Sequence, residues 1–184
     1  MTIIYVIAGA AVLWVIWTYN SLIRLRFRAK EALADIDVQL KRRYDLIPNV
    51  IETVKGYMQH EKTVLENVTK ARTQVMGAGG DLLDPKRENA ENMLSGTLKT
   101  LFAVAENYPD LKANANFLDL QRELADTENK IQAARRFHNT MVRDLNTKIH
   151  SFPTNAVARV FRFHEQKFFE VATAEEKEPV RVKL

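Results

Sequence analysis

The segment KRRYDLIPNVIETV, residues 41–54, decides how the first half of the chain folds. It places Pro48 inside a stretch whose apolar residues recur every three or four positions, as in an amphipathic helix. A loop would usually reset this phase, yet the phase is unbroken from Leu33 to Ile51. We therefore predict a single helix with a kink at Pro48, which steers the helical bundle relative to the stalk that precedes it.

A proline inside a helix has an energetic consequence. Pro48 has no N–H to donate to the carbonyl of Tyr44, and its ring crowds that carbonyl, which together cost about 3 kcal/mol or more. Some other group should offset this loss. The local candidates are Tyr44, Asp45 and Asn49, which surround the proline.

The N-terminus predicts a membrane span. The run IIYVIAGAAVLWVIWTY, residues 3–19, carries no charge, and its helical length of about 26 Å is at the short end of what crosses a bilayer core. Trp14, Trp17 and Tyr19 lie at one end of the run, where membrane proteins place their aromatic belt.

The residues that follow this run separate a retained span from a cleaved signal peptide. Arg24, Arg26 and Arg28 come after the apolar run, whereas a signal peptide carries its basic residues before it. No A-x-A cleavage site follows either. A retained transmembrane helix is therefore favoured over a cleaved signal or a buried core helix.

Charge predicts the orientation of the span. Residues 24–43 hold seven Lys/Arg and three acidic residues, which leaves 20 basic and 20 acidic residues in the rest of the chain. The excess of +4 therefore lies beside the span, which argues against nucleic-acid binding and assigns the basic triplet 41–43 to orientation and membrane proximity. The positive-inside rule places the N-terminus outside and the body of the protein in the cytoplasm.

The remaining pattern predicts an all-α protein: a transmembrane helix followed by an antiparallel bundle of long helices. Apolar residues recur at helical spacing from Leu33 to Val68, and the first clear break is GAGGDLLDP at residues 77–85, where Asp84 and Pro85 read as N-cap and N1 of a new helix. A third helix extends from about Phe117 to about Phe152. We expect a transmembrane anchor at 1–23, the bundle at 24–152, and a short helix and tail at 153–184.

Catalytic motifs do not emerge from the sequence. The histidines show no H-E-x-x-H spacing, His138 reads as a packed core histidine rather than a ligand, and GAGG lacks the context of a nucleotide-binding loop. We expect no catalytic, cofactor or metal site. The candidate polar cluster consists of Tyr44, Asp45, Pro48, Asn49, Thr127 and Glu128. These residues either fix helix register through capping and interhelical hydrogen bonds or form a shared binding site.

The segment FPTNAVARVFRFHEQKFF, residues 152–169, mixes phenylalanines with basic residues. This composition suits a lid that packs on the end of the bundle, and it also suits an interfacial membrane helix. The lid is the preferred interpretation.

Several long motifs resemble the LemA family. They are YNSLIRLR, DIDVQLKRRYDLIPNVIETVKGY, HEKTVLENVTKAR, AENMLSGTLKTLFAVAENYPDLKANANFLDLQRELADTENKIQAARRFHN and FPTNAVARVF, in order from about Tyr19 to about Phe169. The resemblance implies a bacterial single-pass membrane protein with a soluble helical bundle and no established enzymatic activity. Some relatives are associated with membrane-bounded organelles or a membrane metalloprotease. Arg162 departs from the family, which typically has FGF where this chain has FRF, and arginine disfavours the positive φ that glycine allows.

These observations favour a non-enzymatic scaffold or adaptor in the bacterial cytoplasmic membrane. We expect it to contact the bilayer, to form homo-oligomers, and to organise membrane proteins, a membrane protease among the possible partners. A membrane-shaping protein is the first alternative and a ligand sensor the second.

Overall fold

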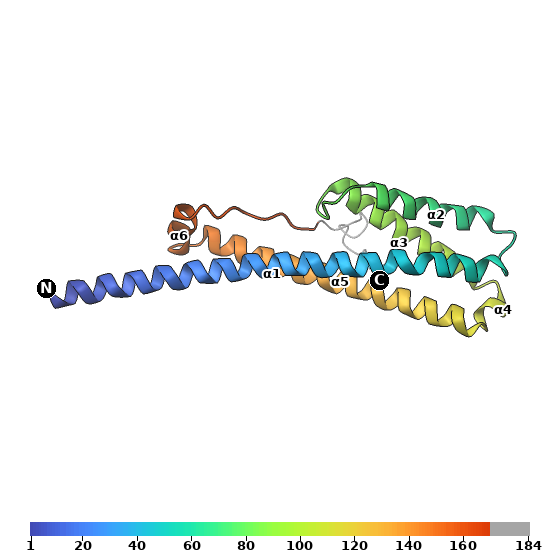
Figure 1. The fold of residues 1–184 in the computed structure, drawn as a ribbon, viewed down its shortest axis with the longest axis horizontal. Coiled ribbons are helices and arrows are strands. Elements are labelled where there is room, and N and C mark those ends of the chain that lie inside the picture. The colour runs from blue at the N-terminus through green and yellow to red at the C-terminus, as the bar shows by residue number, and fades with distance from the viewer. Residues whose placement is uncertain (170–184) are drawn as a thin grey trace, which may run out of the picture. The chain divides into compact units, whose positions relative to one another are not determined.

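The computed structural model describes residues 1–169, and these residues form helices without any strand. The helices are α1 (Thr2–Lys55), α2 (Lys62–Gly77), α3 (Pro85–Ala105), α4 (Pro109–Lys112), α5 (Ala115–His150) and α6 (Thr154–Val160) (Figure 1). The prediction of an all-α fold, with an apolar N-terminal helix followed by packed helices, is confirmed. Residues 170–184 of the predicted tail lie outside the described part of the chain.

Helix α1 joins the apolar run and the proline-containing segment in one element of 54 residues. Pro48 lies inside this helix and is exposed, so the chain does not form a loop there, as the unbroken apolar phase predicted. The steering role of a kink stays a prediction.

The end of α1 corrects the sequence analysis. The apolar period predicted continuous helix past Val68, but α1 ends at Lys55 and the chain turns before α2 begins at Lys62. The turn contains Gly56, a poor helix former, and Met58, whose side chain is fully buried. Met58 lies seven residues before Leu65. Because this turn residue is buried in the core, the helical spacing of apolar residues continues in the sequence although the helix has ended. The predicted cap at Asp84 is present, because its carboxylate accepts a 2.8 Å hydrogen bond from the Lys86 amide.

The described chain divides into two compact units: unit 1 contains residues 1–35 and 133–169, and unit 2 contains residues 36–132. Both α1 and α5 contribute to each unit. The segments expected at 1–23, 24–152 and 153–184 stay a prediction. The core of unit 2 combines four helices: Ile47, Val50 and Val54 of α1, Val68, Ala71 and Val75 of α2, Leu94, Leu98 and Leu101 of α3, and Phe117 and Leu124 of α5.

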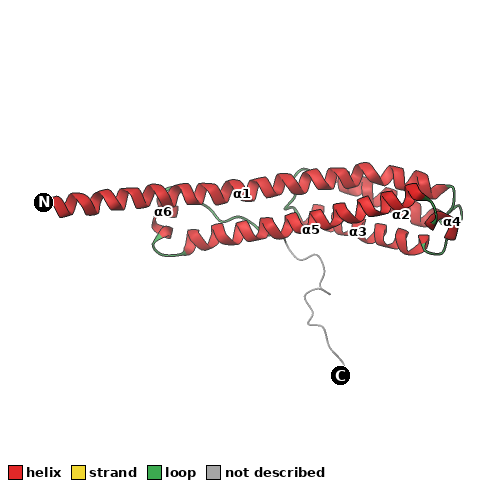
Figure 2. Cartoon of the chain, turned by 90° about the horizontal axis from the view of Figure 1, so that it is seen from below, coloured by secondary structure: helices red, strands yellow, loops and turns green. Residues whose placement is uncertain are grey.

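Unit 1 is a helical hairpin with a short cover. Its buried contacts join Ala29 of α1 to Val142 of α5, and Leu22 of α1 to Leu145 of α5 and Ala158 of α6. Residue numbers therefore fall along α1 as they rise along α5, so the two helices are antiparallel. Helix α6 lies at the end of α5, beside the N-terminal half of α1 (Figure 2).

Arg162 adopts the positive-φ backbone conformation that arginine disfavours. Its φ is 54°, in the left-handed region. The Arg162 amide donates to the Arg159 carbonyl at 3.2 Å, and the Phe163 amide donates to the Ala158 carbonyl at 2.9 Å. These two bonds form a Schellman motif at the end of α6, which usually has glycine at the left-handed position. The turn typical of glycine is thus retained with arginine, at a cost of about 1 kcal/mol.

Candidate functional site

A buried arginine lies at the centre of the polar residues in unit 2. Arg43 is only 2% exposed, and its guanidinium donates to Ser95 Oγ at 2.8 Å and Glu128 Oε2 at 2.7 Å. It also donates to Glu91 Oε2, which is equally buried. We call Arg43, Tyr44, Glu91, Ser95 and Glu128 the Arg43 cluster. It ties α1 to α3 and α5.

A buried phenol and two arginines surround the Glu91 carboxylate in the Arg43 cluster. Tyr44 donates its hydroxyl to Glu91 Oε1, and burial together with this bond raises the pKa of the Tyr44 phenol. Glu91 also faces Arg87, whose Nε lies 3.8 Å from Oε1. Two arginines thus face the buried carboxylate, which offsets the cost of removing it from water. That these residues fix helix register stays a prediction.

The polar residues singled out from the sequence have different positions. Tyr44 and Glu128 meet in the Arg43 cluster. Thr127 is fully buried, but its hydroxyl donates to the Glu123 carbonyl of its own helix at 2.7 Å. Asp45 and Asn49 are exposed on α1 beside Pro48, and the Asn49 carbonyl accepts from Thr53 Oγ1.

Pro48 leaves the Tyr44 carbonyl without its usual N–H donor, and a residue of another helix supplies the hydrogen bond instead. Arg72 of α2 donates from Nε to the Tyr44 carbonyl at 3.0 Å. The expectation that Tyr44, Asp45 or Asn49 would supply this bond is therefore wrong. The donor comes from the neighbouring helix because α2 folds back against α1.

Two of residues 41–43 have partners within unit 2, and the role of the triplet in orientation and membrane proximity stays a prediction. Arg43 is buried in unit 2, and Arg42 pairs with Glu123 of α5 at 2.7 Å. One sequence signal was available: Arg43 lies three residues after Leu40 and four before Ile47, on the same stripe as these buried residues. Glu91 precedes the buried Leu94 by three residues, so its helical spacing also indicated a buried position.

A small pocket adjoins the Arg43 cluster. It has a volume of about 290 Å³ and is lined by Leu98, Phe102 and Leu124 beside Arg43, Ser95 and Glu128. Its polar groups are largely bonded to one another. Among residues 1–169, no set of three or more His, Asp or Glu side chains is placed to hold a metal ion.

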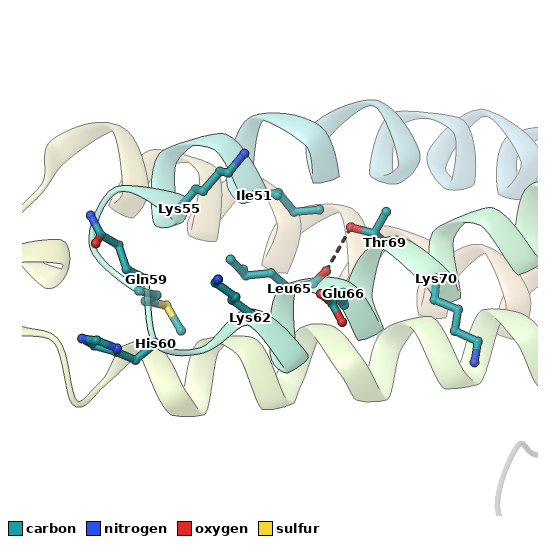
Figure 3. A pocket seen from close by; sticks show the side chains of 10 residues that line it. Ile51, Lys55, Gln59, His60, Lys62, Leu65, Glu66, Thr69 and Lys70 are labelled. Atoms are coloured by element: carbon teal, nitrogen blue, oxygen red, sulfur yellow. Dashed lines mark hydrogen bonds between the residues drawn. The ribbon is translucent and has the colours of Figure 1, made fainter.

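A larger groove lies between α1 and α2 at the end of unit 2 (Figure 3). It measures about 980 Å³, and we call it the lysine groove. Its apolar lining consists of Ile51, Met58 and Leu65. Its polar lining consists of Lys55, Gln59, His60, Lys62, Glu66, Thr69 and Lys70. The lining thus carries three lysines and one glutamate around an apolar floor.

The third region is the predicted anchor. Helix α1 is long and apolar enough to cross a membrane, and only 6% of its most apolar 18-residue window is buried, whereas a core helix of a soluble protein would be mostly buried. Trp17 is 60% exposed and Trp14 and Tyr19 are half-buried, while Arg24, Arg26 and Arg28 are exposed beyond them. The predicted belt and basic flank are thus both accessible in unit 1.

Comparison with known proteins now decides the family. The sequence model of the LemA family matches residues 32–184. The chain belongs to the LemA family. It is 27% identical over 157 residues to Protein LemA of Metamycoplasma hominis, a match that covers 85% of this chain and 70% of that protein.

A second relative is the magnetosome protein MamQ of Magnetospirillum gryphiswaldense. It is 20% identical over 174 residues, a match that covers 82% of this chain but only 64% of MamQ. The LemA family is not known as a family of enzymes. The apolar helix and these relatives together indicate a membrane-anchored protein.

Proposed function

We propose that this LemA-family protein is a non-enzymatic membrane adaptor that holds an acidic helix of a partner membrane protein in the lysine groove. One observation carries the proposal: α1 contains the candidate span at its start and forms one wall of the groove at its end. A partner bound in the groove would thereby be tethered to the membrane.

The chemistry of the groove favours an amphipathic acidic helix. Two roughly parallel helical walls with an apolar floor suit the helix-in-groove mode of recognition. Ile51, Met58 and Leu65 would contact the apolar face of the bound helix. Lys55, Lys62 and Lys70 would meet its carboxylates, since Glu66 offsets only one of the three charges.

The proposed topology follows from the basic flank. Arg24, Arg26 and Arg28 support, by the positive-inside rule, a topology with the chain after the span on the cytoplasmic side of a bacterial membrane. Self-association is the second form of the proposal, in which another copy of this chain occupies the groove. Both forms require an accessible groove in the native membrane.

Site-specific photocrosslinking tests the adaptor. A photoreactive residue at Gln59, an exposed position in the groove, should form a discrete adduct in native membranes. The same residue at Lys86, which is exposed on α3 away from the groove, is the control. Identification of the adduct by mass spectrometry as another protein, joined through an acidic helical segment, supports the adaptor. An adduct between two copies supports self-association and refutes the heterologous form.

Charge reversal provides the matched test of recognition. Replacing Lys55, Lys62 and Lys70 by Glu should abolish the adduct. Replacing three exposed lysines outside the groove by Glu changes net charge equally and should preserve it; these are Lys41, Lys86 and Lys112. If no adduct forms at Gln59, or if both triple variants behave alike, the groove is not the binding surface.

A further inference from the structure

The end of unit 1 formed by α6 and the turn before it has two faces. Its inner face is packed: Val157 and Ala158 are 5% and 1% exposed. Its outer face is apolar and open: Phe152 is 87% exposed and Val160 is 74% exposed. The inner face accounts for the lid predicted from the sequence. The two side chains of the outer face lie on the solvent side of unit 1, and we call Phe152 and Val160 the apolar edge.

The packing of this segment places the apolar edge at the end of the candidate span. Phe161 lies with its ring 4.8 Å from that of Tyr19, the last residue of the apolar run. Phe163 lies 5.8 Å from the same ring, and Ala158 packs in a cluster with Leu22. Tyr19 is one of the aromatic residues expected at the membrane interface.

The pairing of α5 with α1 brings the turn after α5 close to the apolar run of α1. Val142 packs with Ala29, Leu145 with Leu22, and Lys148 bonds Ser21 and lies 5.8 Å from the Trp17 ring. Helix α5 therefore approaches the apolar run as it proceeds. Helix α5 ends at His150, and Phe152 lies in the turn that follows it, at the end of α5 that lies beside the apolar run.

A basic pocket lies beside the apolar edge. It measures about 360 Å³ and is lined by Ile149, His150, Asn155, Arg159, Arg162, Phe163 and His164. Glu165 binds His150 at 2.6 Å and leaves the two arginines to face the pocket. Arg162 occupies it from a strained left-handed backbone position where glycine would be easier. Strain held at a pocket residue is the pattern found at functional sites.

We propose that α6 and its preceding turn form an anionic-lipid site beside the span. Phe152 and Val160 enter the boundary between headgroups and acyl chains, and Arg159 and Arg162 bind the lipid phosphate. Arginine suits this role because its guanidinium forms paired hydrogen bonds with phosphate oxygens. The proposal rests on the membrane anchoring of α1 but not on the lysine groove.

Depth measurement tests the apolar edge. The chain has no cysteine, so single cysteines at Phe152, Val160, Val6 and Phe137 can each carry an environment-sensitive fluorophore in full-length protein reconstituted into vesicles. Phe137 is a matched control: it is 47% exposed on α5, about 16 Å of helix before Lys148. In vesicles with brominated acyl chains, labels at Val6, Phe152 and Val160 should be blue-shifted and quenched, and the label at Phe137 should be neither.

The controls separate the possible failures. If the label at Val6 is not quenched, the span itself is wrong. If Val6 is quenched but Phe152 and Val160 behave like Phe137, the span stands and the lipid site is refuted. Labels at the apolar edge that are shielded from aqueous iodide but not quenched by the lipid indicate a protein contact instead and also refute it.

Lipid composition tests the basic pocket. Quenching at Phe152 should increase when phosphatidylglycerol replaces phosphatidylcholine, and Arg159→Gln/Arg162→Gln should abolish this increase. The control Arg136→Gln/Arg143→Gln removes two exposed arginines of unit 1 outside the pocket and should retain the increase. Quenching that is independent of phosphatidylglycerol, or equally affected by both double variants, overturns the assignment of an anionic-lipid site.

Discussion

The hydrogen bond from Arg72 to the Tyr44 carbonyl predicts that Arg72 and Pro48 are energetically coupled. Pro48 cannot donate to that carbonyl, whereas Arg72 Nε donates to it at 3.0 Å. Arg72→Met retains most of the aliphatic bulk of the side chain and removes the donor. In Pro48→Ala the backbone N–H returns, so the carbonyl no longer depends on Arg72.

The magnitude follows from the exposure of this bond. A hydrogen bond to a charged group contributes about 1.5–3 kcal/mol, and Arg72 is only half-buried, so the low end applies. Arg72→Met should therefore lower the free energy of unfolding by about 1.5 kcal/mol with Pro48 present and by about 0.5 kcal/mol in the Pro48→Ala background. The expected coupling is about 1 kcal/mol. Pro48→Ala alone should stabilise the protein by about 2 kcal/mol, since it removes the helix penalty of proline.

Urea unfolding of the full-length protein in detergent micelles, followed by far-ultraviolet circular dichroism, measures the four states of this cycle. Lys70→Met is the matched control, because it removes an exposed cation from the same helix without removing a donor to Tyr44. It should change stability by less than about 0.5 kcal/mol. If Arg72→Met has the same effect in both backgrounds, Arg72 does not replace the bond lost at Pro48.

Three further predictions follow from other residues. Arg43→Met should destabilise the protein by about 3–5 kcal/mol in the same assay, because Glu91 would be left buried without its main cation, and adding Glu91→Gln should recover part of the loss. Arg162→Gly should stabilise unit 1 by about 1 kcal/mol, seen as slower hydrogen exchange in α6, by relieving the left-handed strain; unchanged exchange would contradict this. Burial lowers the pKa of His138, so unit 1 should lose stability as the pH falls below 6.5, and His138→Leu should flatten that dependence.

The sign of the His138 effect follows from proton linkage. With a folded-state pKa below its ordinary value, the imidazole binds its proton more readily when the protein is unfolded. Its contribution is therefore fully present above pH 6.5 and is lost as the pH falls through the lower folded-state pKa. The imidazole packs against the Phe169 ring at 5.2 Å, and the Arg135 guanidinium lies over the same Phe169 ring at 5.4 Å, so protonation would add a second cation there.

Two asparagines of α5 hold the extended segment after α6 by the same pair of hydrogen bonds to its backbone. The Asn146 side chain exchanges two hydrogen bonds of 3.0 Å with the Gln166 backbone. The Asn139 side chain does the same with Phe169, at 3.0 and 2.9 Å. The two asparagines are one heptad apart on α5, so they present their amides along one face of the helix. Neither asparagine has a local sequence mark of this role, because an amide on a polar helix face looks like any other exposed residue.

The sequence by itself determined the helical class, the apolar N-terminal run, the N-cap at Asp84 and membership of the LemA family. These properties depend on residues a few positions apart, whose spacing is visible in the chain. The end of α1 is the exception, because Met58 is a turn residue buried in the core at a position that continues the helical period.

Only the tertiary structure decided which polar residues act together. Arg43 meets Glu91 and Glu128 across 48 and 85 residues of sequence, and Arg72 reaches Tyr44 across 28. The benefit of each pair depends on burial and on the approach of another helix, which no local pattern specifies. Likewise, the run of phenylalanines and arginines after Phe152 was compatible with a lid and with a membrane helix. Packing against Tyr19 and Leu22 fixed its inner face, and that contact left the apolar edge open beside the span.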